Sequence, residues 1–318
     1  MKAQRKVWGE TVLSLAGSDD RVLVLDADLA TSTQAVQVAN ELPGSFLELG
    51  IAEANMVGVA FGLTTLGYRP WLSTFGVFLT SRSLDQIRMM VSQTNAPVRL
   101  SGAYAGLLNG SSGKTHQDLE DLATMRAMPN MTVLAPADEY EIAAMMPWIA
   151  DHDGPVYLRV ARDAVEPVFD ADYRFVPGRV YELRPGGDVT LVSTGVQTSR
   201  VVQAAGLLAE SGIEAKVVHV PSLKPIDEDG LVAAVGRSPL VITVEEHSVY
   251  GGLGGLVAEI LAGRGGPRVI RHGLADRWSE SAPNDFLLDK YGLSPRRVAD
   301  RVGYLLGARH GVPEAASA

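Results

Sequence analysis

Glu53 is a carboxylate with the potential for acid–base chemistry, and it stands at the start of an expected helix of small and apolar residues over 51–66. One interpretation is that it stabilises the helix N-terminus through the helix dipole. The other is that it is buried, and a buried carboxylate needs a hydrogen-bond partner such as a ligand ring nitrogen. This stretch alone leaves both interpretations open.

Two phenylalanines, Phe75 and Phe78, stand three residues apart after an expected strand that begins at Pro70. Pairs of this kind commonly pack in a protein core. Their flat faces can also form a wall against which a heterocyclic ligand stacks.

A polar, glycine-rich loop covers residues 106–117 and contains His116. Loops of this composition usually lie at the surface, and some position catalytic side chains. The loop does not fit a phosphate-binding P-loop, because its GKT is followed by HQD rather than by a clean helix and the spacing differs. His116 is therefore either an incidental loop residue or a catalytic candidate.

Two arginines, Arg159 and Arg162, close the last expected strand of the first half of the chain. They are either solvated charges or groups that capture a phosphate. The YGGLGG run at 250–255 resembles a dinucleotide loop only superficially, since an acidic residue at the required offset is missing. The remaining histidines lack metal-ligand spacing with one another, so we expect structural or surface roles for them.

Alternating strand-like and helix-like segments must position these side chains. The apolar run over 22–25 is typical of a buried parallel strand, and it ends at Asp26 and Asp28, where α/β proteins place ligands. Strands interleaved with helices imply parallel pairing with right-handed crossovers. Further strands are expected near 98–100, 133–134, 156–160, 189–194, 215–220, 239–246 and 268–274. The predicted fold class is α/β, with two doubly wound domains.

Domain boundaries follow from composition. We expect a first domain over 1–165, a linker rich in Pro, Gly and charge over 166–186, a smaller α/β domain over 187–310, and a loose tail over 311–318.

Bulk composition excludes several classes of protein. The 318 residues carry 37 Asp+Glu against 28 Lys+Arg, a net charge of −9 that argues against nucleic-acid partners and anionic membranes. There are no cysteines, which excludes disulfides and thiolate metal sites. The first twenty residues predict an amphipathic helix rather than a signal peptide, and no apolar run approaches the ~20 residues of a membrane span. We expect a cytoplasmic protein.

In combination and order, the motifs resemble the transketolase family. The resemblance covers nearly the whole chain, through LDAD, GIAEANMVGVAFGL, STFGVFLTSRSLDQIR, THQDLEDLATMRAMPNMTVLAPAD, YLRVAR, VTLVSTGV, VVHVPSLKPID and VEEHSVYGG. It corresponds to the pyrimidine-binding domain followed by the C-terminal domain. The diphosphate-binding domain of the family, with its GDG…N metal signature, does not occur in this sequence.

The resemblance implies the C-terminal subunit of a split, two-gene transketolase. Such an enzyme moves a two-carbon ketol unit from a ketose phosphate to an aldose phosphate with thiamine diphosphate as cofactor. The implied partner is an N-terminal transketolase subunit that carries the diphosphate-binding domain and the ligands of Mg²⁺. The resemblance implies an α2β2 heterotetramer with sites between subunits, active only with both chains.

The resemblance also implies roles for cofactor-binding residues. Glu53 matches the glutamate that hydrogen-bonds the aminopyrimidine and so helps the thiazolium carbon to lose its proton. Phe75 and Phe78 match the aromatic residues packed against the pyrimidine. Asp28 and Ile51 match positions beside the cofactor.

Substrate contacts are implied at three further positions. Ser32 and Arg162 match residues that hold the sugar phosphate, where a planar guanidinium suits bidentate contact. His116 matches a histidine of the substrate channel that contacts sugar hydroxyls and acts in catalysis.

Three positions depart from the family pattern. Tyr104 replaces a histidine, Ser112 replaces an aspartate that contacts a sugar hydroxyl, and Ser81, followed by Arg82, replaces an aromatic residue. Tyr104 and Ser112 remain candidate substrate contacts, and their change favours a modified sugar, branched or sulfonated, as one alternative.

Two different thiamine enzymes share this architecture. Deoxyxylulose-phosphate synthase is expected to have Asp-Arg-Ala-Gly where this chain has Ala-Tyr-Ala-Gly at 103–106, and the beta chain of 2-oxoacid dehydrogenases His-Ser-Gln where it has Thr-His-Gln at 115–117. A non-catalytic remnant is disfavoured, because Glu53, His116 and Arg162 all remain.

Overall fold

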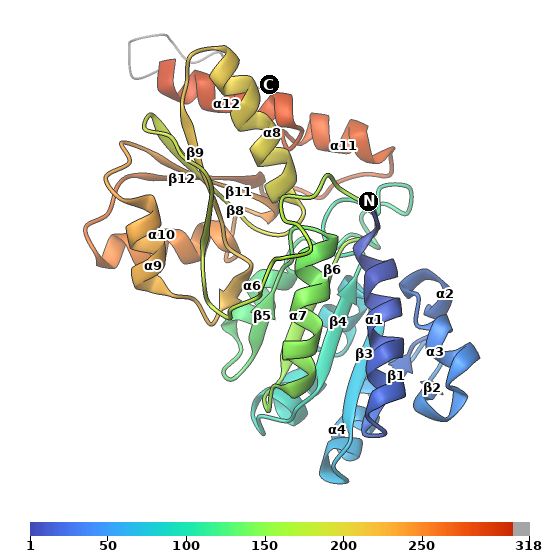
Figure 1. Ribbon diagram of the computed structural model, residues 1–318. Coiled ribbons are helices and arrows are strands. Elements are labelled where there is room, and N and C mark those ends of the chain that lie inside the picture. The colour runs from blue at the N-terminus through green and yellow to red at the C-terminus, as the bar shows by residue number, and fades with distance from the viewer. Residues whose placement is uncertain (308–318) are drawn as a thin grey trace.

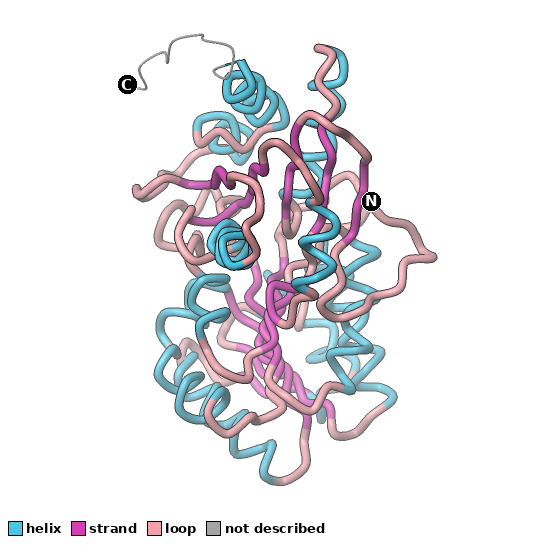
Figure 2. Tube along the Cα trace, turned by 90° about the vertical axis from the view of Figure 1, so that its left-hand side faces the viewer, coloured by secondary structure: helices cyan, strands magenta, loops and turns pink. Residues whose placement is uncertain are grey.

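The computed structural model describes residues 1–307 and contains two sheets with helices packed on them (Figures 1 and 2). The tail predicted at 311–318 and the last three residues of the predicted second domain lie outside the described residues. Within residues 1–307, no helix is both long and apolar enough to cross a membrane.

The first sheet has seven strands in the order β10-β5-β6-β4-β3-β1-β2. Its first six strands in chain order are β1 (Val22–Asp26), β2 (Phe46–Glu48), β3 (Arg69–Phe75), β4 (Arg99–Ala103), β5 (Thr132–Leu134) and β6 (Val156–Val160). These six pair in parallel. Parallel pairing was predicted, although β2 was not among the expected strands. The register aligns Phe75 with Ala103 and Ala103 with Val160, so the ends of β3, β4 and β6 meet at one edge.

Helices cover both faces of this sheet. They are α1 (Gln4–Ser18), α2 (Ala30–Thr33), α3 (Val36–Glu41), α4 (Glu53–Thr65), α5 (Leu84–Gln86), α6 (Asp121–Ala127) and α7 (Glu139–Asp151), with a 3₁₀ turn η1 (Pro43–Ser45). Successive strand side chains point to opposite faces. Val24 and Trp71 join an apolar cluster with α1 and α7, while Leu25 and Leu72 join a second cluster with α4.

The helical segment that follows β3 is interrupted. Two π-helical segments, η2 (Phe78–Arg82) and η3 (Ile87–Ser92), flank the short α5. Such wider turns are rare and often occur at functional sites. Here η2 carries Phe78, one of the predicted cofactor residues, directly after β3.

The second sheet has five strands in the order β12-β11-β8-β9-β7. Its strands are β7 (Tyr181–Arg184), β8 (Val189–Ser193), β9 (Ala215–His219), β11 (Val241–Ser248) and β12 (Val269–Leu274). Its helices are α8 (Gln197–Glu210), α9 (Glu228–Val235), α10 (Leu253–Gly263), α11 (Asn284–Lys290) and α12 (Pro295–Gly307). The strands predicted near 189–194, 215–220, 239–246 and 268–274 correspond to β8, β9, β11 and β12.

Two strands do not follow the expected pattern. β7 lies inside the segment predicted as a linker, 166–186, and pairs antiparallel with β9 at the edge of the second sheet. β10 (Ser222–Lys224) follows β9 but pairs antiparallel with β5, so the second half of the chain completes the first sheet. Both halves of the chain therefore contribute strands to the first sheet.

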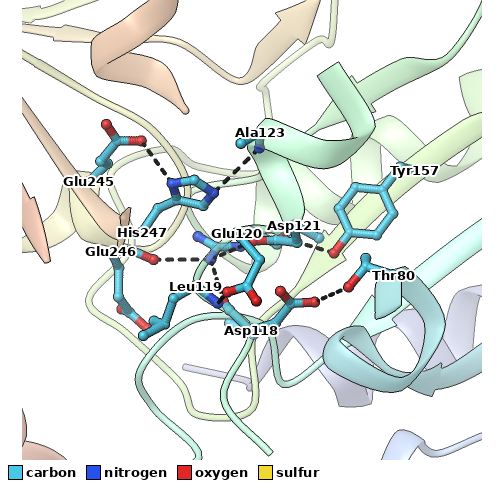
Figure 3. Close-up of polar contacts among 12 residues, drawn as sticks. Thr80, Asp118, Leu119, Glu120, Asp121, Ala123, Tyr157, Glu245, Glu246 and His247 are labelled. Atoms are coloured by element: carbon cyan, nitrogen blue, oxygen red, sulfur yellow. Dashed lines mark hydrogen bonds and ion pairs between the residues drawn. The ribbon is translucent and has the colours of Figure 1, made fainter. Parts of the chain in front are cut away.

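A buried ion-pair network joins the halves (Figure 3). Arg159 of β6 pairs with Asp121 at 2.9 Å and donates to the Glu246 carbonyl of β11 at 3.0 Å. Tyr157 donates to the same Asp121 carboxylate, and Arg200 of α8 pairs with the Glu246 side chain. Arg159 thus differs from both sequence interpretations: it is buried and paired, neither solvated nor open to a phosphate.

Candidate active site

The candidate site lies where β1, β3, β4 and β6 end. The segments that leave these strands carry Asp28 and Ser32 after β1, Phe78 after β3, Tyr104 after β4 and Arg162 after β6. The carboxyl ends of parallel strands are the usual ligand site in open α/β sheets. The fold thus brings residues from distant parts of the sequence to one edge.

Glu53 begins α4 and is only 3% exposed. Its carboxylate accepts a hydrogen bond of 2.9 Å from Arg82 Nη1, and the side chain of Arg82 is half exposed. The helix dipole also favours an anion at this position. Both sequence interpretations therefore hold in part: the carboxylate lies in the first turn, and it is buried against a partner.

Four rings form an aromatic wall: Phe75, Phe78, Tyr104 and His116. Arg82 connects this wall to the Glu53 carboxylate, because its guanidinium carbon lies 4.0 Å from the Phe78 ring centroid. Phe75 stacks on Phe78 with centroids 5.7 Å apart and on Tyr104 at 4.5 Å. His116 presents its edge to Phe78 at 5.2 Å and to Phe75 at 6.1 Å. The predicted phenylalanine pair and the predicted histidine are thus neighbours in space.

Two guanidinium groups lie at the Tyr104 end of the wall. Arg5 donates 2.9 Å hydrogen bonds to the Tyr104 hydroxyl and to the Ser32 carbonyl, and Tyr104 also donates to that carbonyl. The Arg5 and Arg162 guanidinium carbons lie 5.6 and 5.4 Å from the Tyr104 ring centroid. We call Arg5 and Arg162 the arginine pair. Its two positive charges suit an anionic group.

The glycine-rich loop brings His116 to the wall. Thr115 Oγ1 lies 2.8 Å from His116 Nδ1, and Asn109 donates to the His116 carbonyl at 3.3 Å. Asn284 of α11 accepts from Gly110 N at 3.0 Å, which ties the loop to the second domain. Ser112 lies exposed in the turn of this loop.

Asp28 and Ile51, both predicted next to the cofactor, are exposed. Asp28 adopts φ 60°, and its backbone N–H donates to Glu48 Oε1 at 2.9 Å. Ile51 is 71% exposed. The neighbouring Asp26 is instead buried, and burial raises its pKa to about 6 although it accepts hydrogen bonds from Leu29 N and Thr33 Oγ1.

Asp118 contacts the turn η2 through Thr80 (Figure 3). Its Oδ2 accepts a 2.7 Å hydrogen bond from Thr80 of η2, and its Oδ1 has no hydrogen-bond partner among the described residues. Burial, helped by the nearby Asp121 charge, raises the pKa of Asp118 to about 8. The contact with Thr80 anchors the π-helical turn that carries Phe78.

Three residues of the site gained importance only from the structure: Arg5, Asp26 and Arg82. Asp26 follows the apolar run of a predicted buried strand, and this position was the only sign that its carboxyl group is buried. Arg82 was visible as the residue after a departure from the family pattern. Arg5 carried no signal, because it is one of three basic residues within the first six positions, with Lys2 and Lys6.

Comparisons with known proteins identify the family of the chain. A family model described as the transketolase pyrimidine binding domain matches residues 1–167, and one described as the transketolase C-terminal domain matches residues 178–298. A protein of Methanocaldococcus jannaschii that carries the provisional description of a transketolase C-terminal section is 38% identical, over 95% of this chain and 95% of its own.

Two further matches come from split enzymes or their subunits. A 6-deoxy-6-sulfo-D-fructose transketolase subunit of Clostridium sp. is 35% identical over 92% of this chain and 91% of its own. A solved split-gene transketolase, described as an inactive β4 tetramer, is 40% identical, with a TM-score of 0.86 and coverage of 96% and 98%. The chain therefore belongs to the transketolase family, as the C-terminal subunit of a split transketolase, a transferase of the thiamine diphosphate-dependent kind.

Proposed function

We propose that Glu53 is the acid that meets the pyrimidine ring of thiamine diphosphate and that the aromatic wall holds the face of that ring. The observation that carries this proposal is a buried carboxylate next to an aromatic face that is partly open: Glu53 is 3% exposed, while Phe78 is only half-buried. When bound, the cofactor supplies the carbon that accepts the two-carbon unit and stores the resulting negative charge. Glu53 contributes a fixed carboxyl group whose hydrogen bond orients the ring and shifts its proton.

The arginine pair is the proposed site of the sugar phosphate. Arg5 and Arg162 flank Tyr104, and Ser32 lies against the same hydroxyl through its carbonyl. A doubly charged phosphate prefers guanidinium donors in a fixed geometry. His116, whose ring edge faces Phe75 and Phe78, is proposed to contact sugar hydroxyls and to move a proton there.

The other end of the cofactor is proposed to lie on a second polypeptide. The similarity to a transketolase C-terminal section and to a transketolase subunit supports an enzyme made of two chains. A hard cation such as Mg²⁺ needs oxygen ligands together with the diphosphate. Among residues 1–307, no group of three or more His, Asp or Glu side chains is arranged to hold a metal ion. We assign the Mg²⁺ ligands to the N-terminal transketolase subunit, in an α2β2 assembly with this chain.

A modified sugar is the second candidate for substrate. Ser112 is exposed in its loop and offers a hydroxyl where the family pattern has a carboxylate. The similarity to a subunit that acts on a sulfonated fructose supports this alternative. A screen of plain, branched and sulfonated donors distinguishes the two candidates, because specificity is a ratio of kcat/KM values.

Reconstitution tests the proposed function. This chain is mixed with the partner subunit, thiamine diphosphate and Mg²⁺, and ketol transfer between sugar phosphates is measured. The pair is expected to be active and each chain alone inactive, and Glu53→Ala is expected to reduce kcat by at least about a hundredfold. The matched control is Glu41→Ala, which removes an exposed glutamate of α3. Activity of Glu53→Ala close to that of the control refutes the assignment.

A further inference from the structure

A guanidinium group covers the two side chains that are proposed to receive the pyrimidine ring. Arg82 Nη1 donates to Glu53 Oε1 at 2.9 Å. The same guanidinium carbon lies 4.0 Å from the centroid of the Phe78 ring. One flat group thus makes both contacts that a flat heterocycle would make here, a hydrogen bond to the buried acid and a stack on the aromatic face.

We propose that Arg82 occupies the pyrimidine seat and must leave it before the cofactor binds. The seat is defined by Glu53 and Phe78, so this inference rests on the proposed function. A guanidinium and an aminopyrimidine share a planar N–C–N unit that can present N–H to a carboxylate and a face to a ring. Both groups cannot hold the same carboxylate oxygen and the same ring face at once.

The local fold explains how Arg82 reaches this position. Phe78 and Arg82 are the first and last residues of the π-helical turn η2, so their side chains leave neighbouring positions of one wide turn. The intervening Ser81 is small and exposed, which leaves room beside the ring. The seat is therefore filled from within the same turn that builds its wall.

Burial decides which partner moves. The Glu53 side chain is 4% exposed and is fixed by α4, whereas the Arg82 side chain is 48% exposed. A long, half-exposed arginine can rotate into water at little cost, while the carboxylate cannot follow it. Departure of Arg82 leaves a buried acid without its charged partner, and the ring nitrogen of an incoming heterocycle then becomes its hydrogen-bond partner.

The size of the effect follows from occupancy of the seat. When the competent state is populated only in part, the apparent dissociation constant rises by the inverse of that fraction. A half-exposed ion pair and a cation–π contact each contribute a modest interaction free energy. Together they are expected to weaken cofactor binding by about threefold to thirtyfold. Arg82 is thus an intramolecular competitor of the cofactor.

Direct binding measurements test the inference. Thiamine diphosphate is titrated calorimetrically, at saturating Mg²⁺, into the reconstituted two-subunit complex with Arg82→Met, Arg82→Lys or wild-type chain. We expect Arg82→Met to bind the cofactor about threefold to thirtyfold more tightly. Arg82→Lys, which keeps the charge but loses the flat stacking face, is expected to fall between. The matched control is Arg88→Met, an exposed arginine of η3 that contacts Met89.

A gain in affinity is diagnostic, because general damage to the fold does not tighten binding. Unchanged or weaker cofactor binding in both Arg82 variants, with normal circular dichroism, overturns the inference. If Glu53→Ala abolishes ketol transfer while the Arg82 variants bind as the wild type does, only the inference fails. If Glu53→Ala remains active, the proposed function itself fails.

Discussion

The Tyr104 ring stacks on the Phe75 ring with centroids 4.5 Å apart and an interplanar angle of 23°. Tyr104 has φ 59°, a left-handed conformation that is rare and costly for a bulky residue. Strain of this kind persists where the surroundings over-determine the conformation, and it clusters at functional sites. Tyr104 thereby links the aromatic wall to the arginine pair.

The Tyr104 hydroxyl is expected to contribute to substrate binding. Tyr104→Phe keeps the stack but removes the hydroxyl that Arg5 donates to. Because Arg5 loses one of its anchors, we expect KM for the sugar phosphate to rise about fivefold, which corresponds to about 1 kcal/mol. Steady-state kinetics of the reconstituted enzyme measure this, with Tyr140→Phe on α7 as control. An unchanged KM contradicts the assigned link.

Arg162 is expected to recognise the phosphate rather than the sugar. Arg162→Met should raise KM for phosphorylated donors by about tenfold or more, and Arg162→Lys by less, because a lysine keeps charge but not the planar fork. An unphosphorylated ketose should show little change. Comparing the two donors on each variant is the measurement. Equal losses for both donors would place Arg162 outside the phosphate site.

The buried pair between Arg159 and Asp121 is expected to stabilise the junction of the two domains. Its side chains are 8% and 0% exposed, whereas Glu259, which pairs with Arg126, is 62% exposed. Asp121→Ala leaves a buried guanidinium unpaired and should cost about 3–5 kcal/mol. Glu259→Ala should cost at most about 1 kcal/mol. Denaturant midpoints of both variants provide the test, and similar shifts would contradict the contrast.

Asp118 is expected to make stability fall as pH rises. Its pKa is raised on folding from 3.8 to about 8, so the folded chain keeps a proton that the unfolded chain releases. Stability is therefore lost progressively between about pH 4 and pH 8. Asp118→Asn can still accept the Thr80 hydrogen bond without titrating. The Tm of the variant minus the Tm of the wild type should be larger at pH 8 than at pH 5. An equal Tm difference at both pH values would oppose this account.

Much of the fold was predictable because its strands are local apolar runs. The runs over 22–25, 156–160 and 189–194 became β1, β6 and β8 with little displacement. β7 and β10 were not predicted, because short polar segments become strands only through partners distant in the chain. Pairing of β10 with β5 spans about ninety residues, and no local pattern encodes it.

Only some of the site residues could be identified from the sequence, for a related reason. Glu53, Phe75, Phe78 and His116 carried signals in residue type and neighbourhood. The structure brings the three rings together, and Arg82 connects them to Glu53. The contact of Arg82 with Glu53 spans 29 positions and depends on the π-helical turn, which the sequence did not indicate. The position of Arg159 at a strand end suggested a phosphate ligand, but its pairing with the distant Asp121 was not visible in the sequence.

The most direct test concerns the carboxyl group of Glu53. In the reconstituted enzyme, hydrogen–deuterium exchange at the reactive thiazolium carbon of bound thiamine diphosphate can be followed by NMR after rapid quenching. Glu53→Gln keeps the size of the side chain but cannot shift a proton. The account predicts exchange slowed by at least about a hundredfold in this variant. Exchange at the wild-type rate, with cofactor bound, would contradict the central role given to Glu53.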